Sequence, residues 1–115
     1  MAKANLTVVC TYRVQKAREK AFLGLLRRHW PALRRLDLVT EEPASAWRGE
    51  ESDGRPFYVE IFTWKSASAV RSAHSFPAVA AIWEPMETMC EARGERAAME
   101  FPHVAPVKLR RATHA

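Results

Sequence analysis

The stretch FYVEIFTW, residues 57–64, is the most strand-like part of this chain and decides its fold. Its side chains alternate between two faces, and β-branched and aromatic residues occur on both, which is typical of a β-strand. One face carries Phe57, Val59, Ile61 and Thr63, and the other carries Tyr58, Glu60, Phe62 and Trp64. The shorter run ASAWRGEE, residues 44–51, precedes it, and the turn between them contains Asp53-Gly54, a strong hairpin signal. The sequence therefore predicts a β-hairpin formed by residues 44–51 and 57–64.

Upstream of this hairpin the chain predicts a strand followed by a helix. Residues 6–14, LTVVCTYRV, alternate with period two, which indicates a strand. Residues 16–36 change to helical spacing, with apolar residues recurring every three or four positions. Pro31 lies inside this pattern, and it lacks a backbone donor and disfavours helical geometry at Trp30. A kink or a break near residue 30 is therefore expected.

Downstream of the hairpin the chain predicts a second helix and a last strand. Ser66 or Ser68 can cap the helix, Pro77 interrupts it, and Gly94 ends it. The last strand spans about 97–109 and contains two prolines. Because proline cannot donate a hydrogen bond to a neighbouring strand, this strand is expected at an edge of the sheet.

The order of these elements is β-α-β-β-α-β, which predicts an α+β, ferredoxin-like fold. In this arrangement two helices pack on one face of a four-stranded antiparallel sheet. A chain of 115 residues suits one domain, residues 1–115, with a core over about 6–109.

The uncovered face of the sheet predicts a homodimer. We expect Val59 and Ile61 to pack under the helices, which leaves the Glu60 face of the same strand open. That face also carries Tyr58, Phe62 and Trp64, and such an aromatic patch is larger than soluble monomers usually expose. A second copy of the chain is expected to cover it.

Composition restricts the class of protein. The hydrophobic fraction of 48% is that of a globular chain, and no run approaches the ~18 apolar residues of a membrane span. Residues 1–5 lack the zones of a signal peptide, so a cytoplasmic location without a membrane partner is expected. Cys10 and Cys90 are expected to be reduced thiols in or near the core, without a disulfide.

The net charge of +5 raises the question of a nucleic-acid partner. Lys16, Lys20, Arg27 and Arg34 follow one helical stripe, which is typical of the solvated face of an amphipathic helix. The chain has no RNP-like aromatic motif, zinc-finger spacing or helix-turn-helix signature, so no nucleic acid is expected. It also has no HxxxH, HxH or paired-carboxylate spacing and no GxGxxG loop, so no metal is expected either.

Residues 57–66 (FYVEIFTWKS), followed by Ala73-His74, Pro77 and residues 81–86 (AIWEPM), resemble the antibiotic-biosynthesis-monooxygenase-like family. This family belongs to the dimeric α/β-barrel superfamily, and the resemblance covers nearly the whole chain. It implies a dimeric α/β barrel. The characterised members include oxygenases that act on aromatic polyketides and quinols without a cofactor, and enzymes that degrade haem.

The resemblance implies a cofactor-independent monooxygenase that acts on a small phenolic or quinol-like compound. The deprotonated substrate would itself donate electrons to dioxygen, so no cofactor is needed. In haem-degrading members an axial histidine lies late in the second helix with a tryptophan nearby, and Trp83 and Ala73 stand in those regions here. An alternative is a non-catalytic homodimer that binds a small hydrophobic molecule or is associated with stress. A third interpretation is an accessory protein for nucleic acid.

Two residues are candidates for catalysis, and each has a structural alternative. His74, beside apolar positions of the second helix, could be a base toward a phenolic substrate or a histidine packed at the rim of the core. Glu60, flanked by apolar residues, could be a base or a buried ion-pair partner of Arg13 or Arg48 on neighbouring strands.

Aromatic side chains are the candidates for binding an aromatic ligand. Trp30, Trp47, Trp64 and Trp83 could wall a pocket, although ordinary packing in the core or an interface explains them as well. The expected substrate-binding residues are Trp64, Trp83, Tyr12, Tyr58 and Met86.

Overall fold

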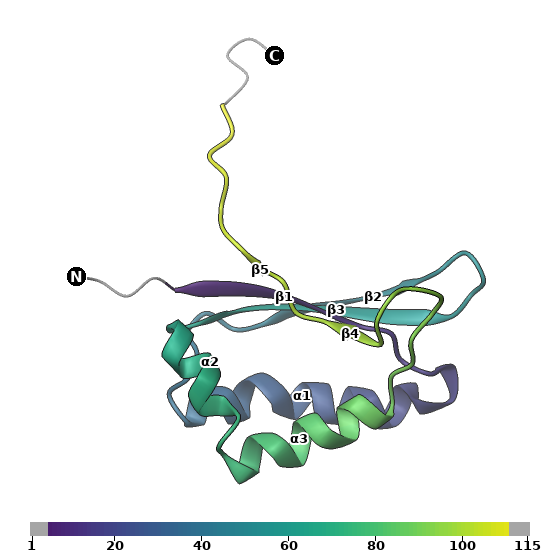
Figure 1. The fold of residues 1–115 in the computed structure, drawn as a ribbon, viewed down its shortest axis with the longest axis horizontal. Helices are drawn as coiled ribbons and strands as arrows, with labels where there is room; N and C mark the ends of the chain where they lie inside the picture. Colours follow the sequence, from purple (N-terminus) through teal and green to yellow (C-terminus); the bar gives the residue numbers. More distant parts are fainter. Residues whose placement is uncertain (1–4, 111–115) are drawn as a thin grey trace.

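An antiparallel sheet with three α-helices on one of its faces makes up the computed structural model, which describes residues 5–110 (Figure 1). The strands are β1 (Leu6–Tyr12), β2 (Ser45–Glu50), β3 (Pro56–Trp64), β4 (Met99–Glu100) and β5 (His103–Val104). The helices are the 3-10 helix η1 (Lys16–Arg18), α1 (Glu19–Arg35), α2 (Ala67–Ala73) and α3 (Pro77–Thr88). The sheet has the order β2-β3-β1-β4, and β5 pairs with β1 on the side of β4. The predicted α+β, ferredoxin-like order of elements is confirmed.

The predicted hairpin is also confirmed. Strands β2 and β3 pair in register from Ser45↔Ile61 to Glu50↔Pro56. Gly54 in the turn has a φ of 87°, in the left-handed region that glycine adopts without steric cost. On its other side β3 pairs with the whole of β1, so β3 lies in the middle of the sheet.

The two faces of β3 are the reverse of the sequence prediction. The face that was expected to be open is buried, and it carries Tyr58, Glu60, Phe62 and Trp64. Val59 and Ile61 are half-buried on the open face. The ring of Tyr58 lies 5.4 Å from that of Phe22 in α1, which places this face under the helices. The prediction was wrong because both faces of β3 are apolar, and period alone does not say which one the helices cover. The large aromatic rings fill the space between the layers.

The helices differ from the prediction in two respects. Helix α3 ends at Thr88, with Met89 as its C-cap residue, so the prediction that Gly94 ends the second helix was wrong. Helix α1 continues through Pro31 without a break, and Pro31 is exposed. On the solvent side of a helix, a carbonyl that proline leaves without a donor can turn toward water. The second helix divides at Pro77 into α2 and α3, and Ser66 caps α2 by accepting a hydrogen bond from the amide of Ala69 at 3.2 Å, both as predicted.

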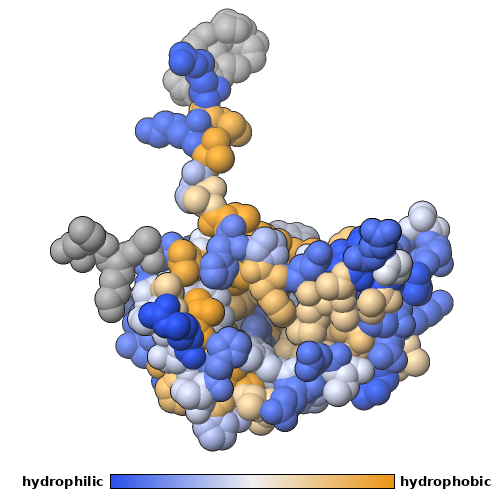
Figure 2. All heavy atoms as spheres, in the orientation of Figure 1, coloured by the Kyte–Doolittle hydropathy of each residue, from blue (hydrophilic) through white to orange (hydrophobic). Residues whose placement is uncertain are grey.

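The last strand is shorter than the predicted 97–109. It consists of β4 and β5, which Phe101 and Pro102 separate, and both lie at the sheet edge next to β1 as expected. Beyond Val104 the chain leaves the sheet on the side opposite the helices (Figure 1) and carries both hydrophobic and hydrophilic residues (Figure 2). No helix within residues 5–110 is long and apolar enough to span a membrane.

Candidate functional site

A cavity of about 820 Å³ lies between the covered face of the sheet and helices α2 and α3, beside residues 97–103. This volume is in the range of pockets that bind small molecules. Five aromatic side chains wall it, and they are Tyr12, Phe62, Trp64, Trp83 and Phe101. Val8, Cys10, Val70 and Met86 add apolar surface. The cavity therefore suits a small, flat, apolar ligand.

Four of the five expected substrate-binding residues line this cavity: Tyr12, Trp64, Trp83 and Met86. Tyr58 is not among the lining residues. Its hydroxyl donates a hydrogen bond to Glu19 at 2.7 Å, toward the other end of α1. Of the other tryptophans, Trp47 is 56% exposed on the open face of the sheet and Trp30 packs against the core.

A chain of hydrogen bonds joins four side chains from four elements, and we call it the His29–Glu60 cluster. Its members are Tyr12 of β1, His29 of α1, Glu60 of β3 and Trp83 of α3. The Tyr12 hydroxyl donates to Oε1 of Glu60 at 2.7 Å, and Nδ1 of His29 lies 2.9 Å from the same oxygen. On the other side of the imidazole, Nε1 of Trp83 lies 2.8 Å from Nε2 of His29.

The hydrogen-bond partners of His29 determine its tautomer. An indole nitrogen can only donate, so Nε2 of His29 accepts from Trp83 and carries no proton. The proton of the neutral imidazole is then on Nδ1, from which it is donated to Glu60. Glu60 thus accepts two hydrogen bonds at Oε1, one from Tyr12 and one from His29.

The carboxylate of Glu60 is buried without a cation. Glu60 is 1% exposed and His29 is 3% exposed, and within residues 5–110 no lysine or arginine contacts Glu60. The predicted partners bind elsewhere: Arg13 pairs with Glu100 at 3.0 Å, and Arg48 pairs with Glu19 at 2.7 Å. The prediction of an arginine partner for Glu60 was wrong, because Arg13 turns to the open side of the sheet. A buried charge without a counter-charge is costly, so this arrangement is unusual.

Burial raises the pKa of the Tyr12 hydroxyl well above its usual range, and the nearby Glu60 carboxylate raises it further. The hydroxyl therefore stays protonated and donates to Glu60 over the whole neutral range of pH.

His29 is the member of this cluster that the sequence did not single out. It lies among apolar residues of α1, four positions after Leu25 and four before Leu33, and this spacing is typical of a side chain that packs in the core. Two signals were available in the sequence. His29 is a polar residue on the inward face of a helix, and Glu60 is a polar residue in a central strand. Recognising it would have required the correct inward face of β3.

His74 lies at the rim of the cavity. It is the C-cap residue of α2, is exposed, and packs the edge of its ring against Trp83 with 5.1 Å between centroids. The rim also carries Glu84, Glu87 and His103, and no described lysine or arginine lines the cavity. The charges near the mouth are therefore acidic, although the whole chain is basic.

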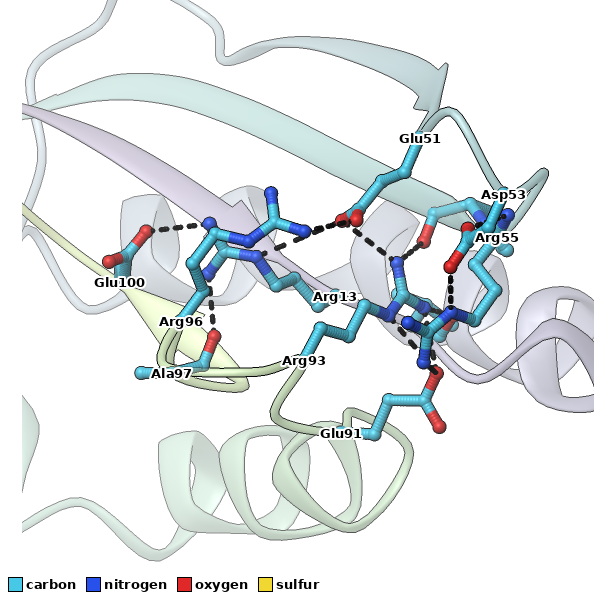
Figure 3. A network of polar contacts seen from close by, with 11 residues as sticks. Arg13, Glu51, Asp53, Arg55, Glu91, Arg93, Arg96, Ala97 and Glu100 are labelled. Atoms are coloured by element: carbon cyan, nitrogen blue, oxygen red, sulfur yellow. Dashed lines mark hydrogen bonds and ion pairs between the residues drawn. The ribbon is translucent and has the colours of Figure 1, made fainter.

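An arginine network holds the cavity wall formed by residues 97–101 (Figure 3). Arg13 donates from its side chain to the Ala97 carbonyl and from its backbone amide to the Ala98 carbonyl. Arg93, 3% exposed, donates to the carbonyls of Val14 and Pro56, each at 2.8 Å.

Two carboxylates complete this group, which we call the Arg93–Glu51 network. Arg93 pairs with Glu51 at 3.1 Å and with Glu91 at 2.9 Å, and Arg96 also binds Glu51. The network ties the segment after α3 to the β2–β3 hairpin, and so it fixes one side of the cavity.

Both cysteines are free thiols, as predicted. Cys10 lines the cavity, and burial raises its pKa far above the usual range. Burial also raises the pKa of Cys90, to about 11. Neither thiol is therefore ionised at neutral pH. Among the described residues no group of three or more His, Cys, Asp or Glu side chains could hold a metal ion.

Solved structures share this fold. The structure of SnoaB, a cofactor-independent oxygenase from Streptomyces nogalater, matches with a TM-score of 0.64 at 17% identity, covering 96% of this chain and 98% of that one. Rv0793 from Mycobacterium tuberculosis matches with a TM-score of 0.64 at 14% identity, over 92% and 98% of the two chains. An antibiotic biosynthesis monooxygenase matches with a TM-score of 0.66 at 13% identity, over 90% and 99%.

These likenesses confirm the fold and the resemblance that the sequence predicted. Neither a protein-family model nor a curated protein matches the chain. At identities this low the shared property is the fold, and any argument about a ligand has to come from the cavity itself.

Proposed function

We propose that the cavity binds a small aromatic compound with an ionisable hydroxyl group, and that the protein promotes oxygenation of this compound without a cofactor. The observation that carries the proposal is the aromatic cavity of about 820 Å³, whose lining includes a buried imidazole, that of His29, hydrogen-bonded to the carboxylate of Glu60. The fold shared with a structure named as a cofactor-independent oxygenase supports it.

The chemistry needs little from the protein. A phenol or quinol that loses its proton becomes a good electron donor, and dioxygen accepts the electrons. One oxygen atom enters the substrate, and the other leaves as water with the two hydrogens that the substrate loses. The protein supplies aromatic walls that orient the ring, a site that excludes water, and a group that takes the first proton.

Three histidines line the cavity, His29, His74 and His103, and their imidazoles can accept that proton. Glu60 is not a lining residue and acts through the imidazole of His29, with which it shares a hydrogen bond. His74 stands at the rim in contact with Trp83.

Oxygen consumption tests the proposal. A panel of quinols and phenols is incubated with the protein in air, and oxygen uptake and the oxygenated product are measured against the uncatalysed rate and an anaerobic control. We expect uptake above background for at least one ring that fits the cavity. No uptake for any member would remove the oxygenase function.

His74→Ala suppresses turnover if the rim imidazole takes the proton. Ser75→Ala is the matched control, because Ser75 is the neighbouring exposed residue and does not line the cavity.

A non-catalytic binding protein is the second candidate. The observation that favours it is that Trp83 already occupies Nε2 of His29, so the imidazole has no free acceptor in this state. Binding alone raises the midpoint of thermal unfolding as ligand concentration rises, without oxygen uptake.

We also propose that the protein is a homodimer formed through the open face of the sheet. The side chains on that face are uncharged along the central strands, and they are Thr7, Val9, Thr11, Trp47, Phe57, Val59, Ile61 and Thr63. So large an uncharged face, with Trp47 56% exposed, is typical of a surface that a partner covers. Sedimentation velocity should show a dimer, and Val59→Lys should convert it to a monomer. A monomeric wild-type protein at micromolar concentration would remove this proposal.

A further inference from the structure

We propose that His29 accepts the proton of the ligand hydroxyl in this cavity, and that Trp83 keeps the accepting nitrogen unprotonated until the ligand displaces its indole N–H. The proposal rests on the proposed function for the class of ligand, a neutral aromatic compound with a weakly acidic hydroxyl group. It adds the group that takes the proton and the residue that controls it.

The first argument is the charge of the His29–Glu60 cluster. The carboxylate of Glu60 is buried, its two hydrogen-bond donors Tyr12 and His29 are uncharged, and no described lysine or arginine contacts it. A proton added to Nε2 of His29 turns the pair into an imidazolium beside a carboxylate. The buried negative charge then has its counter-charge at 2.9 Å, so the cluster gains stability by taking a proton.

The second argument is the geometry of the transfer. His29 lines the cavity, and Nε2 is the nitrogen that faces Trp83, another lining residue. A ligand hydroxyl that takes the place of the indole N–H donates to Nε2. The O–H bond then breaks and an N–H bond forms at Nε2, while the Nδ1 proton stays with Glu60. The ligand stays bound as a phenolate, the cluster becomes neutral, and no electron moves.

Trp83 controls the proton transfer because its indole N–H occupies Nε2 of His29, the atom that would accept the proton. The groups that face His29 are Glu60 from β3, Tyr12 from β1 and Trp83 from α3, and only Glu60 among them is charged. While the indole donates to Nε2, a proton from solvent has no lone pair to bind there. Trp83 is half-buried at the cavity wall, with Trp64 and His74 as edge-on neighbours, so its ring is within reach of an entering ligand.

His74 does not meet these conditions. It is exposed, its ring makes no hydrogen bond to another described residue, and no carboxylate lies within ion-pair distance of it in residues 5–110. A proton on His74 would be stabilised mainly by solvent, which is equally available to the free ligand.

A chromogenic phenol tests the transfer without oxygenation. The probe is 4-nitrophenol under anaerobic conditions, at a pH where the free compound is mainly neutral, and the phenolate absorbs at a longer wavelength than the phenol. Quenching of tryptophan fluorescence reports binding, and the phenolate band reports the position of the proton. We expect the wild-type protein to bind the probe as phenolate.

The variants separate the roles. His29→Gln and Glu60→Gln should bind the probe and lose the phenolate band. Trp83→Phe should shift the band to higher pH, because solvent protons now compete for Nε2. Trp30→Phe is the matched control, since its indole nitrogen makes no hydrogen bond, and it should keep the wild-type profile.

The outcomes that overturn the inference are distinct from failure of the oxygenase function. Quenching without a phenolate band in the wild type would overturn it, and so would a band that persists in both His29→Gln and Glu60→Gln. Loss of the band in His74→Gln with retention in His29→Gln would move the acceptor to the rim. If His29→Gln does not fold, the phenolate bands of Glu60→Gln, which is nearly isosteric with the wild type, and of Trp83→Phe test the inference. No quenching at all would overturn the inference together with the ligand class, whereas a phenolate band without oxygen uptake would leave it standing and remove only the oxygenase.

Discussion

The His29–Glu60 cluster and the Arg93–Glu51 network are both buried and hydrogen-bonded, yet they differ in charge balance. Arg93 lies between two carboxylates and two carbonyls, so each charge has an opposite neighbour. Glu60 has only neutral donors. A balanced cluster fixes the structure around it, because removing its buried member Arg93 leaves carboxylates without their nearest counter-charge. An unbalanced cluster can take up a proton, which is what a site of proton transfer needs.

The largest expected effect comes from breaking the balanced cluster. Arg93→Ala leaves Glu51, Glu91 and two carbonyl oxygens with fewer donors, and we expect the free energy of unfolding to fall by about 3–5 kcal/mol. Urea denaturation measures it. Arg96→Ala is the matched control, because Arg96 binds the same Glu51 from a side chain that is 53% exposed. It should lose less than about 1 kcal/mol. Equal losses in the two variants would show that burial does not set the difference.

The unbalanced cluster should respond in the opposite direction. Glu60→Gln keeps an oxygen that can accept from Tyr12 and His29 but removes the buried charge. We expect the free energy of unfolding to rise by about 1 kcal/mol, while oxygenation falls by about a hundredfold or more. Urea denaturation and oxygen uptake on the same preparation test both. A loss of about 3 kcal/mol would mean that Glu60 has a counter-charge after all, and the contrast between the clusters would fail.

The two clusters should make the free energy of unfolding depend on pH in different ranges. The His29–Glu60 cluster acts at alkaline pH, and the Arg93–Glu51 network acts at acidic pH. The raised pKa of Tyr12 means that the folded state keeps a proton that the unfolded state loses above about pH 10, so stability falls as pH rises beyond that point. Burial acts to raise the pKa of Glu51, but hydrogen bonds from Arg96 and Arg93 outweigh it and hold the pKa below 4.5. The stability from Glu51 is therefore present above this value and is lost as pH falls below it.

The midpoint of thermal unfolding, measured from pH 3 to 11, gives both parts of this profile. Stability falls with falling pH in the acid limb and with rising pH in the alkaline limb. Tyr12→Phe should reduce the slope of the alkaline limb and leave the acid limb, and Glu51→Gln should reduce the slope of the acid limb and leave the alkaline limb. Burial also raises the pKa of Cys10, far above its usual range, and that of Cys90, to about 11, so both thiols keep an alkaline slope in Tyr12→Phe. An alkaline limb that Tyr12→Phe leaves unchanged would show that the phenol is not held in its protonated form by burial.

The smallest effect is expected at the exposed margin of the Arg93–Glu51 network. Arg55, 43% exposed, pairs with Asp53 at 2.8 Å and with Glu91 at 3.5 Å (Figure 3). Arg55→Ala should lower the free energy of unfolding by less than about 1 kcal/mol, because solvent screens the charges. A loss close to that of Arg93→Ala would mean that the network acts as one unit.

Much of the fold could be predicted, because its elements have local signals. The hairpin follows from the alternation of residues 57–64 and the Asp53-Gly54 turn, and the division of the second helix follows from Pro77. The face of β3 could not be predicted, since both its faces are apolar and the choice depends on which side chains fill the space under α1. The unbroken course of α1 through Pro31 depends on that residue facing solvent, which is also a tertiary property.

The candidate site was predicted in part for the same reason. Trp64 and Trp83 were expected at a ligand pocket and line the cavity, and Glu60 was singled out as a buried carboxylate. Its partner His29 is 31 residues away in sequence and lies on an apolar helix face, where nothing local marks it. Contacts between elements that are distant in sequence carry this information, and a single sequence does not show them.

The wall of residues 97–101 has a consequence for kinetics. The short strand β4, the contacts with Arg13 and the packing of Phe101 against Tyr12 hold this segment, whereas β1 and β3 pair along seven residues. Its backbone has few partners in the sheet, so we expect this segment to open early in local fluctuations. Amide hydrogens here should exchange faster than those of β3, and the rate of this opening would set how quickly a ligand enters and leaves the cavity.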